Sequence, residues 1–153
     1  MLRDKELKLF LDGTQELGDN FSFSQGAGGN TSYKEGESLT VKASGCKLKK
    51  AREEQIFVNL NRNTVLKQLS KNVNEQKKSF EPEKIKLRPS IETLMHAVIP
   101  YKYVFHIHCL NTLGLLVQDG FEEYLKDIFE DLNYAIIQYV KPGISLAKEI
   151  SKV

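Results

Sequence analysis

Helical and strand-like hydrophobic spacings alternate along the chain. Apolar residues recur at helical spacing between residues 4 and 16, and Gly18 provides a natural end to that helix. The segment SQGAGGN at 24–30 then predicts a glycine-rich loop. Residues 31–34 and 38–43 predict two strands joined by a turn at Glu35-Gly36-Glu37, so the chain is expected to open with a helix followed by a β-hairpin.

The same alternation continues to the end of the sequence. Residues 71–86 are rich in Lys, Glu, Asn and Gln and predict a solvent-exposed connection. Residues 90–99 predict a short helix, because Pro89 suits a first helical turn and Pro100 marks an end. The remaining predicted elements are a basic helical turn at 47–53, strands at 55–60, 103–108 and 134–140, and helices at 111–117, 121–129 and 144–150.

Composition limits the class of protein and the kinds of partner that this α/β pattern can represent. A chain of 153 residues suits one domain, residues 1–153, and its 41% hydrophobic and 27% charged residues are typical of a globular protein. The 22 basic and 20 acidic residues are well mixed, so we expect no nucleic-acid partner. The first ten residues contain no apolar run for a signal peptide or a membrane span, so we expect a cytoplasmic protein without a membrane partner. Cys46 and Cys109 are expected to be reduced thiols.

The only three histidines lie close together, at positions 96, 106 and 108. On a strand, His106 and His108 project to the same side, at a separation that one zinc ion can bridge. The alternative is a pair of partly buried, hydrogen-bonded rings. Cys109 follows directly, but alternation along the strand points it away from the pair, so it is expected to be a packing residue.

An acidic position precedes the histidines. Glu92 lies four residues before His96, on the same face of the predicted helix, and both could face the strand that follows. An ordinary surface pair is the alternative. A glutamate beside zinc can either bind the metal or transfer a proton, and the spacing leaves both roles open.

Three further segments offer donors to an anion. The glycine-rich segment 26–32 would present backbone amides and the side chain of Asn30, although a simple turn is the commoner explanation. Ser44-Gly45, with Lys42 beside it, offers a second hydroxyl and amide. Ser90, near the start of a predicted helix, offers a third hydroxyl, with helix capping as its alternative role.

Four segments, taken in order, resemble one known family. GGNTS at 28–32, VKASG at 41–45, RPSIETLMH at 88–96 and VFHIH at 104–108 are similar to motifs of the class II aldolase and adducin N-terminal family. The resemblance runs from about residue 4 to residue 150. It implies a single α/β/α layered domain with a largely antiparallel central sheet.

The resemblance also implies a site and a reaction. The implied site residues are Asn30, Ser44, Gly45 and Ser90 for the phosphate or terminal polar end of a sugar substrate, Glu92 as the catalytic acid/base, and His106 and His108 as zinc ligands. The implied reaction is retro-aldol cleavage of a sugar or sugar phosphate through an enediolate. A non-catalytic adducin-like binding or assembly module is the alternative, as is an epimerase or dehydratase of the same family. Homo-oligomers, often tetramers, are typical of the family.

Two positions differ from the family pattern. Ile91 stands where family aldolases often carry a second hydroxyl. Family members bring a third zinc histidine from a later segment, whereas no histidine follows His108 in this sequence. We therefore expect a domain shortened before the region that carries this ligand, with the third ligand unidentified.

Overall fold

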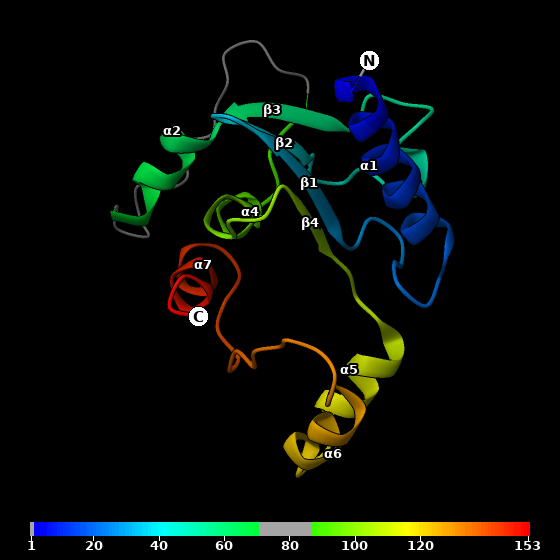
Figure 1. The fold of residues 1–153 in the computed structure, drawn as a ribbon, viewed down its shortest axis with the longest axis vertical. Coiled ribbons are helices and arrows are strands. Elements are labelled where there is room, and N and C mark those ends of the chain that lie inside the picture. Colours follow the sequence, from blue (N-terminus) through cyan, green and yellow to red (C-terminus); the bar gives the residue numbers. More distant parts are fainter. Residues whose placement is uncertain (1, 71–86) are drawn as a thin grey trace.

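A four-stranded antiparallel sheet forms the centre of the computed structural model, which describes residues 2–70 and 87–153 (Figure 1). The strands, in sheet order, are β3 (Phe57–Asn61), β2 (Ser38–Lys42), β1 (Asn30–Glu35) and β4 (Tyr103–His106). The predicted hairpin is confirmed, and Gly36 makes its turn with a φ of +56°. On its other side β1 pairs with β4, so that Asn30 lies opposite His106.

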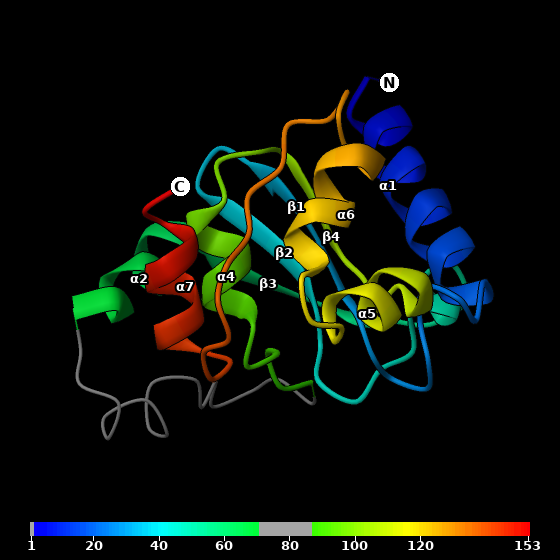
Figure 2. The same ribbon diagram turned by 90° about the horizontal axis from the view of Figure 1, so that it is seen from below.

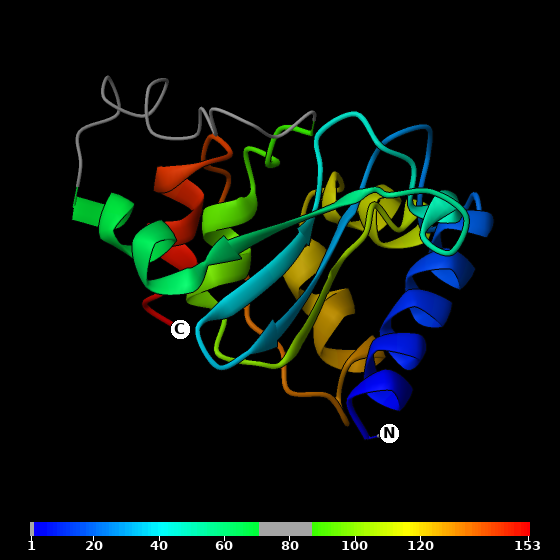
Figure 3. The same ribbon diagram turned by 90° about the horizontal axis from the view of Figure 1, so that it is seen from above.

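Helices cover both faces of the sheet, as Figure 3 shows. α1 (Leu2–Asp19) lies on one face, and α4 (Thr93–Val98) and α7 (Ile144–Ile150) lie on the other. α2 (Arg62–Leu66) follows β3 and contacts α4. This arrangement confirms the predicted α/β/α layered domain with an antiparallel central sheet.

Alternation along the strands builds a core on each face of the sheet. On the α1 face, Phe10 is 1% exposed, and its ring lies 5.2 to 6.4 Å from four aromatic rings of the sheet. Burying a side chain of this size contributes roughly 1.5–3 kcal/mol. The buried cluster on the α4 face consists of Leu39, Val41, Ala43, Val58, Val65, Leu94, Ala97, Ile144 and Ala147.

Two further helices, α5 (Leu110–Leu116) and α6 (Phe121–Ile128), follow β4. Figure 1 shows them set apart from the sheet, and Figure 2 shows the chain returning from α6 to α7. The large apolar side chains exposed along this part of the chain are Leu110, Leu113, Leu116, Val117, Tyr124, Ile128, Leu132, Tyr134, Ile136 and Tyr139. None of the helices within residues 2–70 and 87–153 is long and apolar enough to cross a membrane.

Some predicted boundaries were wrong. α1 continues to Asp19, so Gly18 is not a stop. A Cβ at Gly18 would lie 2.1 Å from the backbone nitrogen of Lys49, beside the 3-10 helix η1 (Leu48–Lys50), so the glycine permits a close approach of two elements. The strand predicted at 134–140 does not form, because none of the described strands pairs with it. The connection predicted at 71–86 lies outside the described residues.

Two corrections affect the segments that carry the site. The predicted helix at 90–99 begins only at Thr93, and Pro89 is not in its first turn but in an isolated bridge with Ala43. β4 ends at His106 rather than His108, because β1 begins at its register partner Asn30. Beyond that point the His108 amide donates to the carbonyl of Phe23, 2.9 Å away, so the backbone pairs with the glycine-rich loop region instead.

Candidate active site

Glu92 lies just before α4, beside the end of the sheet where β1 begins and β4 ends. Asn30 Nδ2 donates a hydrogen bond to Glu92 Oε2, and Nδ1 of His106 lies 3.3 Å from the same oxygen. The side chains of His106 and Glu92 are only 25% and 17% exposed. Because Asn30 and His106 are register partners on adjacent strands, their side chains share one face, and Glu92 contacts both.

The neighbours of Glu92 favour its ionised form. Burial raises the pKa of this carboxyl, but the His106 ring and the Asn30 amide outweigh that effect, so the pKa lies below its usual value. Glu92 is therefore a carboxylate at neutral pH. A partly buried carboxylate that stays ionised can accept a proton from a bound molecule.

His106 and His108 remain neighbours although only His106 belongs to the strand. Their ring centroids lie 5.0 Å apart, in an edge-to-face arrangement. The glycine-rich loop packs directly against them: a Cβ at Gly28 would stand 3.0 Å from Nδ1 of His108 and 2.9 Å from the Gln25 carbonyl. Only glycine fits there without displacing His108.

Unsatisfied polar atoms show what the Glu92 cluster, which consists of Asn30, Glu92, His106 and His108, could hold. Within the described part of the chain, Nδ1 of His106 and Oδ1 of Asn30 are buried without a hydrogen-bond partner, since the 3.3 Å contact with Glu92 lacks hydrogen-bond geometry. Imidazole nitrogen is a preferred donor to zinc. His106 therefore has an unpaired nitrogen that fits a divalent metal, and the neighbouring His108 ring is the second candidate ligand. Residues 2–70 and 87–153 contain no group of three or more His, Cys, Asp or Glu placed to hold a metal ion.

The residues expected to bind the polar end of a substrate adjoin this cluster. The antiparallel bridge between Ala43 and Pro89 brings the segment that carries Ser44 against the segment that carries Ser90, and the Ser44 amide donates to the carbonyl of Arg88 at 2.8 Å. Ser90 Oγ accepts a hydrogen bond from the Glu92 amide at 3.2 Å. Gly45 has a φ of +77°, and a Cβ added to it would meet no described atom within 4 Å, so the space beside its α-carbon is open. Ser44 and Gly45 are exposed, whereas Ser90 is buried.

Asn30 differs from the role expected of it, because its amide nitrogen is already bonded to Glu92. Its buried carbonyl oxygen is the atom left for a ligand. Sequence spacing did not indicate this contact, since the two residues meet only through the pairing of β1 with β4 and the position of α4. The structure thus brings all seven expected site residues to one end of the sheet.

Lys42 has a larger role than its sequence suggested. It is 1% exposed, and its Nζ donates to the carbonyl of Ala27 at 2.9 Å and to that of Cys46 at 2.6 Å. One ammonium group thus joins the glycine-rich loop to the turn at Ser44-Gly45. Burial lowers the pKa of Lys42, partly offset by the charges of Cys46 and Glu92. The position of this lysine between Val41 and Ala43, at the end of a strand, was the available signal.

His96 and Ser32 form a second buried pair near Glu92. His96 is 0% exposed, and its Nδ1 lies 2.8 Å from Ser32 Oγ. Burial, together with the charges of His106 and Lys34, lowers the pKa of His96 to about 3. The ring is therefore neutral at physiological pH.

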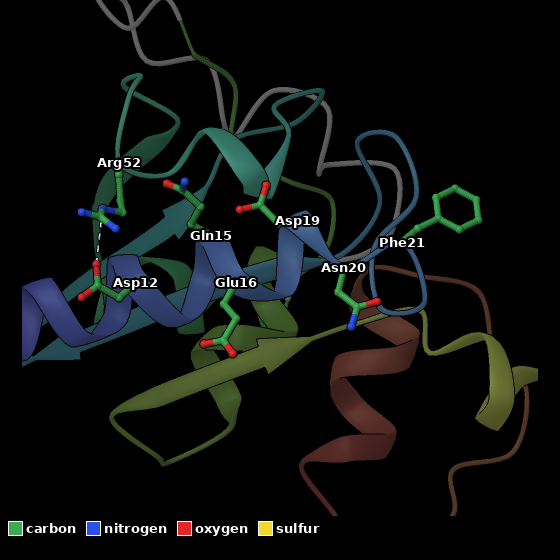
Figure 4. A pocket seen from close by; sticks show the side chains of 7 residues that line it. All are labelled: Asp12, Gln15, Glu16, Asp19, Asn20, Phe21 and Arg52. Atoms are coloured by element: carbon green, nitrogen blue, oxygen red, sulfur yellow. Dashed lines mark ion pairs between the residues drawn. The ribbon is translucent and has the colours of Figure 1, made fainter.

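Two surface hollows lie elsewhere, along α1. One, of about 700 Å³, is shown in Figure 4; its lining residues are Asp12, Gln15, Glu16, Asp19, Asn20, Phe21 and Arg52. Asp12 is already paired with Lys8 at 2.5 Å and Arg52 at 3.3 Å, and Figure 4 shows Phe21 directed away from the other side chains. The second hollow, of about 320 Å³, reaches Phe105. Within the described ranges, neither hollow is lined by a residue of the Glu92 cluster.

A protein family and a solved domain resemble the chain over most of its length. The family described as Class II Aldolase and Adducin N-terminal domain matches residues 12–153. The solved N-terminal class II aldolase domain of a conserved protein from Thermoplasma acidophilum superposes with a TM-score of 0.77 at 28% identity, covering 94% of this chain and 72% of that one. A protein named "Uncharacterized oxidoreductase YuxG" from Bacillus subtilis (strain 168) is 38% identical over 65 residues, which are 42% of this chain and 9% of that protein's length. The chain therefore belongs to the class II aldolase and adducin N-terminal domain family.

Proposed function

We propose that this domain is a zinc-dependent aldolase that cleaves a sugar or sugar phosphate by a retro-aldol reaction through an enediolate. One observation carries the proposal: the Glu92 carboxylate, held ionised, lies 3.3 Å from a ring nitrogen of His106, and the His108 ring lies next to it. A base beside two metal-binding side chains is the arrangement that this chemistry needs.

The residues of the chain have distinct roles in this proposal. His106 and His108 would hold a divalent metal, which supplies positive charge for the carbonyl and hydroxyl oxygens of the substrate. When the carbon–carbon bond breaks, its electron pair passes to the ketone fragment, which becomes an enediolate. Glu92 would accept the proton of the hydroxyl that becomes the aldehyde carbonyl and then deliver it to the enediolate carbon, and in the reverse direction both transfers run backwards. Asn30 orients Glu92 by its hydrogen bond.

The polar end of the substrate would bind on the other side of Glu92. Ser44 and Ser90 provide hydroxyls, and the exposed backbone at Gly45 provides an amide. The buried ammonium of Lys42 lies between this turn and the glycine-rich loop and adds positive potential. A phosphate or another anionic group is the ligand that such donors favour.

Metal content tests the metal part of the proposal. The purified parent protein is expected to bind zinc, and the His106→Ala/His108→Ala double variant is expected to lose it. Leu9→Ala, at an exposed position of α1, is a control that should bind zinc like the parent. Equal and negligible zinc in the parent and the double variant would refute the proposal that this protein is a metalloenzyme.

Glu92→Gln tests the base separately. The substitution keeps the shape of the side chain but removes its ability to accept a proton, so turnover of a ketose phosphate is expected to fall by roughly 10²-fold or more. Bound zinc is expected to remain. Unchanged turnover would remove Glu92 from the mechanism. The products of the parent reaction distinguish an aldolase from an epimerase or a dehydratase.

A non-catalytic binding or assembly module like adducin is the second candidate. The apolar side chains exposed along α5 and α6 favour it, because such surfaces mark sites of protein interaction. Under this alternative the parent would bind neither zinc nor a ketose phosphate. We also propose that the chain forms a homo-oligomer, with a tetramer as the size implied by the family.

A further inference from the structure

α4 is connected to β1 by two side-chain hydrogen bonds that lie one helical turn apart. Asn30 donates to Glu92, and two residues further along the strand Ser32 contacts His96, four residues further along the helix. The His96 amide donates to the Glu92 carbonyl at 3.2 Å, so residues 92 and 96 span one turn. Four helical residues rise about 6.0 Å and two strand residues about 6.6 Å, so the two spacings match to within about 1 Å.

The second of these bonds is completely buried. Ser32 and His96 are both 0% exposed, and the contact between Oγ and Nδ1 is 2.8 Å. Among the described residues, the other ring nitrogen of His96 has no hydrogen-bond partner. An apolar side chain at position 96 would avoid burying that unpaired atom. The imidazole therefore makes one directional hydrogen bond, while burial of its unpaired nitrogen lowers the stability of the fold. This combination is typical of a residue that fixes the relative position of two elements.

We infer that Ser32 and His96 are positioning residues for Glu92. Their bond sets the rotation and height of α4 on β1, and thereby keeps the Glu92 carboxylate against Asn30 and 3.3 Å from His106. The consequence for catalysis rests on the proposed function, in which Glu92 transfers the proton. The positioning itself can be measured without any substrate.

The opposite face of the same strand offers a matched control. Thr14 on α1 donates to Thr31 on β1 at 3.0 Å, and both residues are 0% exposed. Like Ser32 with His96, this is a buried helix-to-strand bond, and Thr31 is the residue between Asn30 and Ser32. Thr31→Val therefore removes an equivalent bond closer in sequence to Asn30 but on the face away from Glu92.

The side-chain amide of Asn30 is the direct reporter, and its ¹H–¹⁵N resonances can be assigned by their loss in Asn30→Asp. In Ser32→Ala and His96→Leu these resonances are expected to move toward the values of a free amide. They should stay in place in Thr31→Val. His96→Asn, which places a polar atom near the position of Nδ1, is expected to restore much of the parent spectrum. Unmoved resonances in Ser32→Ala and His96→Leu, or an equal movement in Thr31→Val, would overturn the inference.

Proton exchange provides the catalytic readout. Dihydroxyacetone phosphate in D₂O is the probe, since removal of its hydroxymethyl proton needs only the base and the polarised carbonyl. Ser32→Ala is expected to lower kcat for exchange by roughly 10- to 100-fold, with KM and bound zinc nearly unchanged, because small displacements of a catalytic group are costly. Thr31→Val should retain the parent kcat. If the parent shows no exchange, the proposed function fails, while the Asn30 resonances still decide the positioning role.

Discussion

Buried polar residues determine the properties of this site at the scale of single side chains. Asn30, Lys42 and His96 are each at most 5% exposed, although residues of these types usually lie nearer the surface. Each has a specific partner: a carboxylate, two backbone carbonyls and a serine hydroxyl, respectively. A buried polar group left without a partner costs roughly 1–3 kcal/mol. Removing a partner of any of these residues should therefore destabilise the site end of the sheet.

His96 makes the stability of the fold depend on pH. Its pKa is lowered from 6.5 to about 3 by burial and by the charges of His106 and Lys34. Between these values the unfolded chain binds a proton that the folded chain does not, so the free energy of unfolding decreases as pH falls from about 6.5 toward 3. Between pH 7 and pH 5 the decrease from this residue is about 2 kcal/mol.

Urea unfolding at pH 7 and pH 5 measures this dependence. We expect His96→Leu to lose about 2 kcal/mol less than the parent over this interval, because leucine cannot bind the proton. Equal losses in both proteins would show that His96 is not buried in its neutral form.

The types of the site residues were predictable, but their contacts were not. Glu92, His106 and His108 were recognisable from short motifs, and the structure brings them together. The bond between Asn30 and Glu92 depends on two tertiary pairings of segments far apart in the chain, which local spacing does not encode. His108 remains beside His106 through the backbone of Phe23, not through the strand alternation that predicted it.

At the scale of elements, local patterns predicted what depends on local structure. The hairpin of β1 and β2 and helix α7 follow from alternation, turn residues and helical spacing. Residues 134–140 have good strand formers, but a strand also needs a partner, and none of the strands in the described ranges provides one. Likewise the sequence pattern predicts a helix end at Gly18, because the close approach of η1 is a tertiary contact that local spacing does not encode.

Two glycines of α1 should respond to alanine in opposite directions. At Gly18 the added Cβ would lie 2.1 Å from the nitrogen of Lys49, so the helix must move, and we expect destabilisation by roughly 1–3 kcal/mol. At Gly13 the Cβ would lie 3.7 Å from the ring of Phe105, an ordinary contact. Alanine there should stabilise the helix by about 0.5–1 kcal/mol. Thermal unfolding of both variants checks the signs, and a loss of stability in Gly13→Ala comparable to that in Gly18→Ala would contradict the packing argument.

For the whole molecule, the exposed apolar side chains of α5 and α6 are the main feature that the sheet and its core leave unexplained. Buried apolar side chains hold the layered part together, whereas Leu113 is 45% exposed and Ile128 is 61% exposed. Surfaces of this kind favour association. The expected homo-oligomer would cover them.

Sedimentation velocity over a range of protein concentrations tests this association. The parent is expected to form a species larger than a monomer, and Leu113→Lys/Ile128→Lys is expected to shift toward the monomer, because burying lysine charges is costly. Leu9→Lys, at a position 65% exposed on α1, is the control and should associate like the parent. A monomeric parent, or equal weakening by the control, would exclude this surface as the interface.

The register of Asn30 opposite His106 also bears on the order of folding. β1, β2 and β3 follow one another along residues 30–61, so their pairing closes comparatively short loops. β4 can join β1 only after a much longer loop has closed, and such steps are entropically costly and slow. We therefore expect the three-stranded meander to form first and the contact among Asn30, Glu92 and His106 to form last. Under the proposed function, acquisition of zinc during refolding would then lag behind the formation of the sheet.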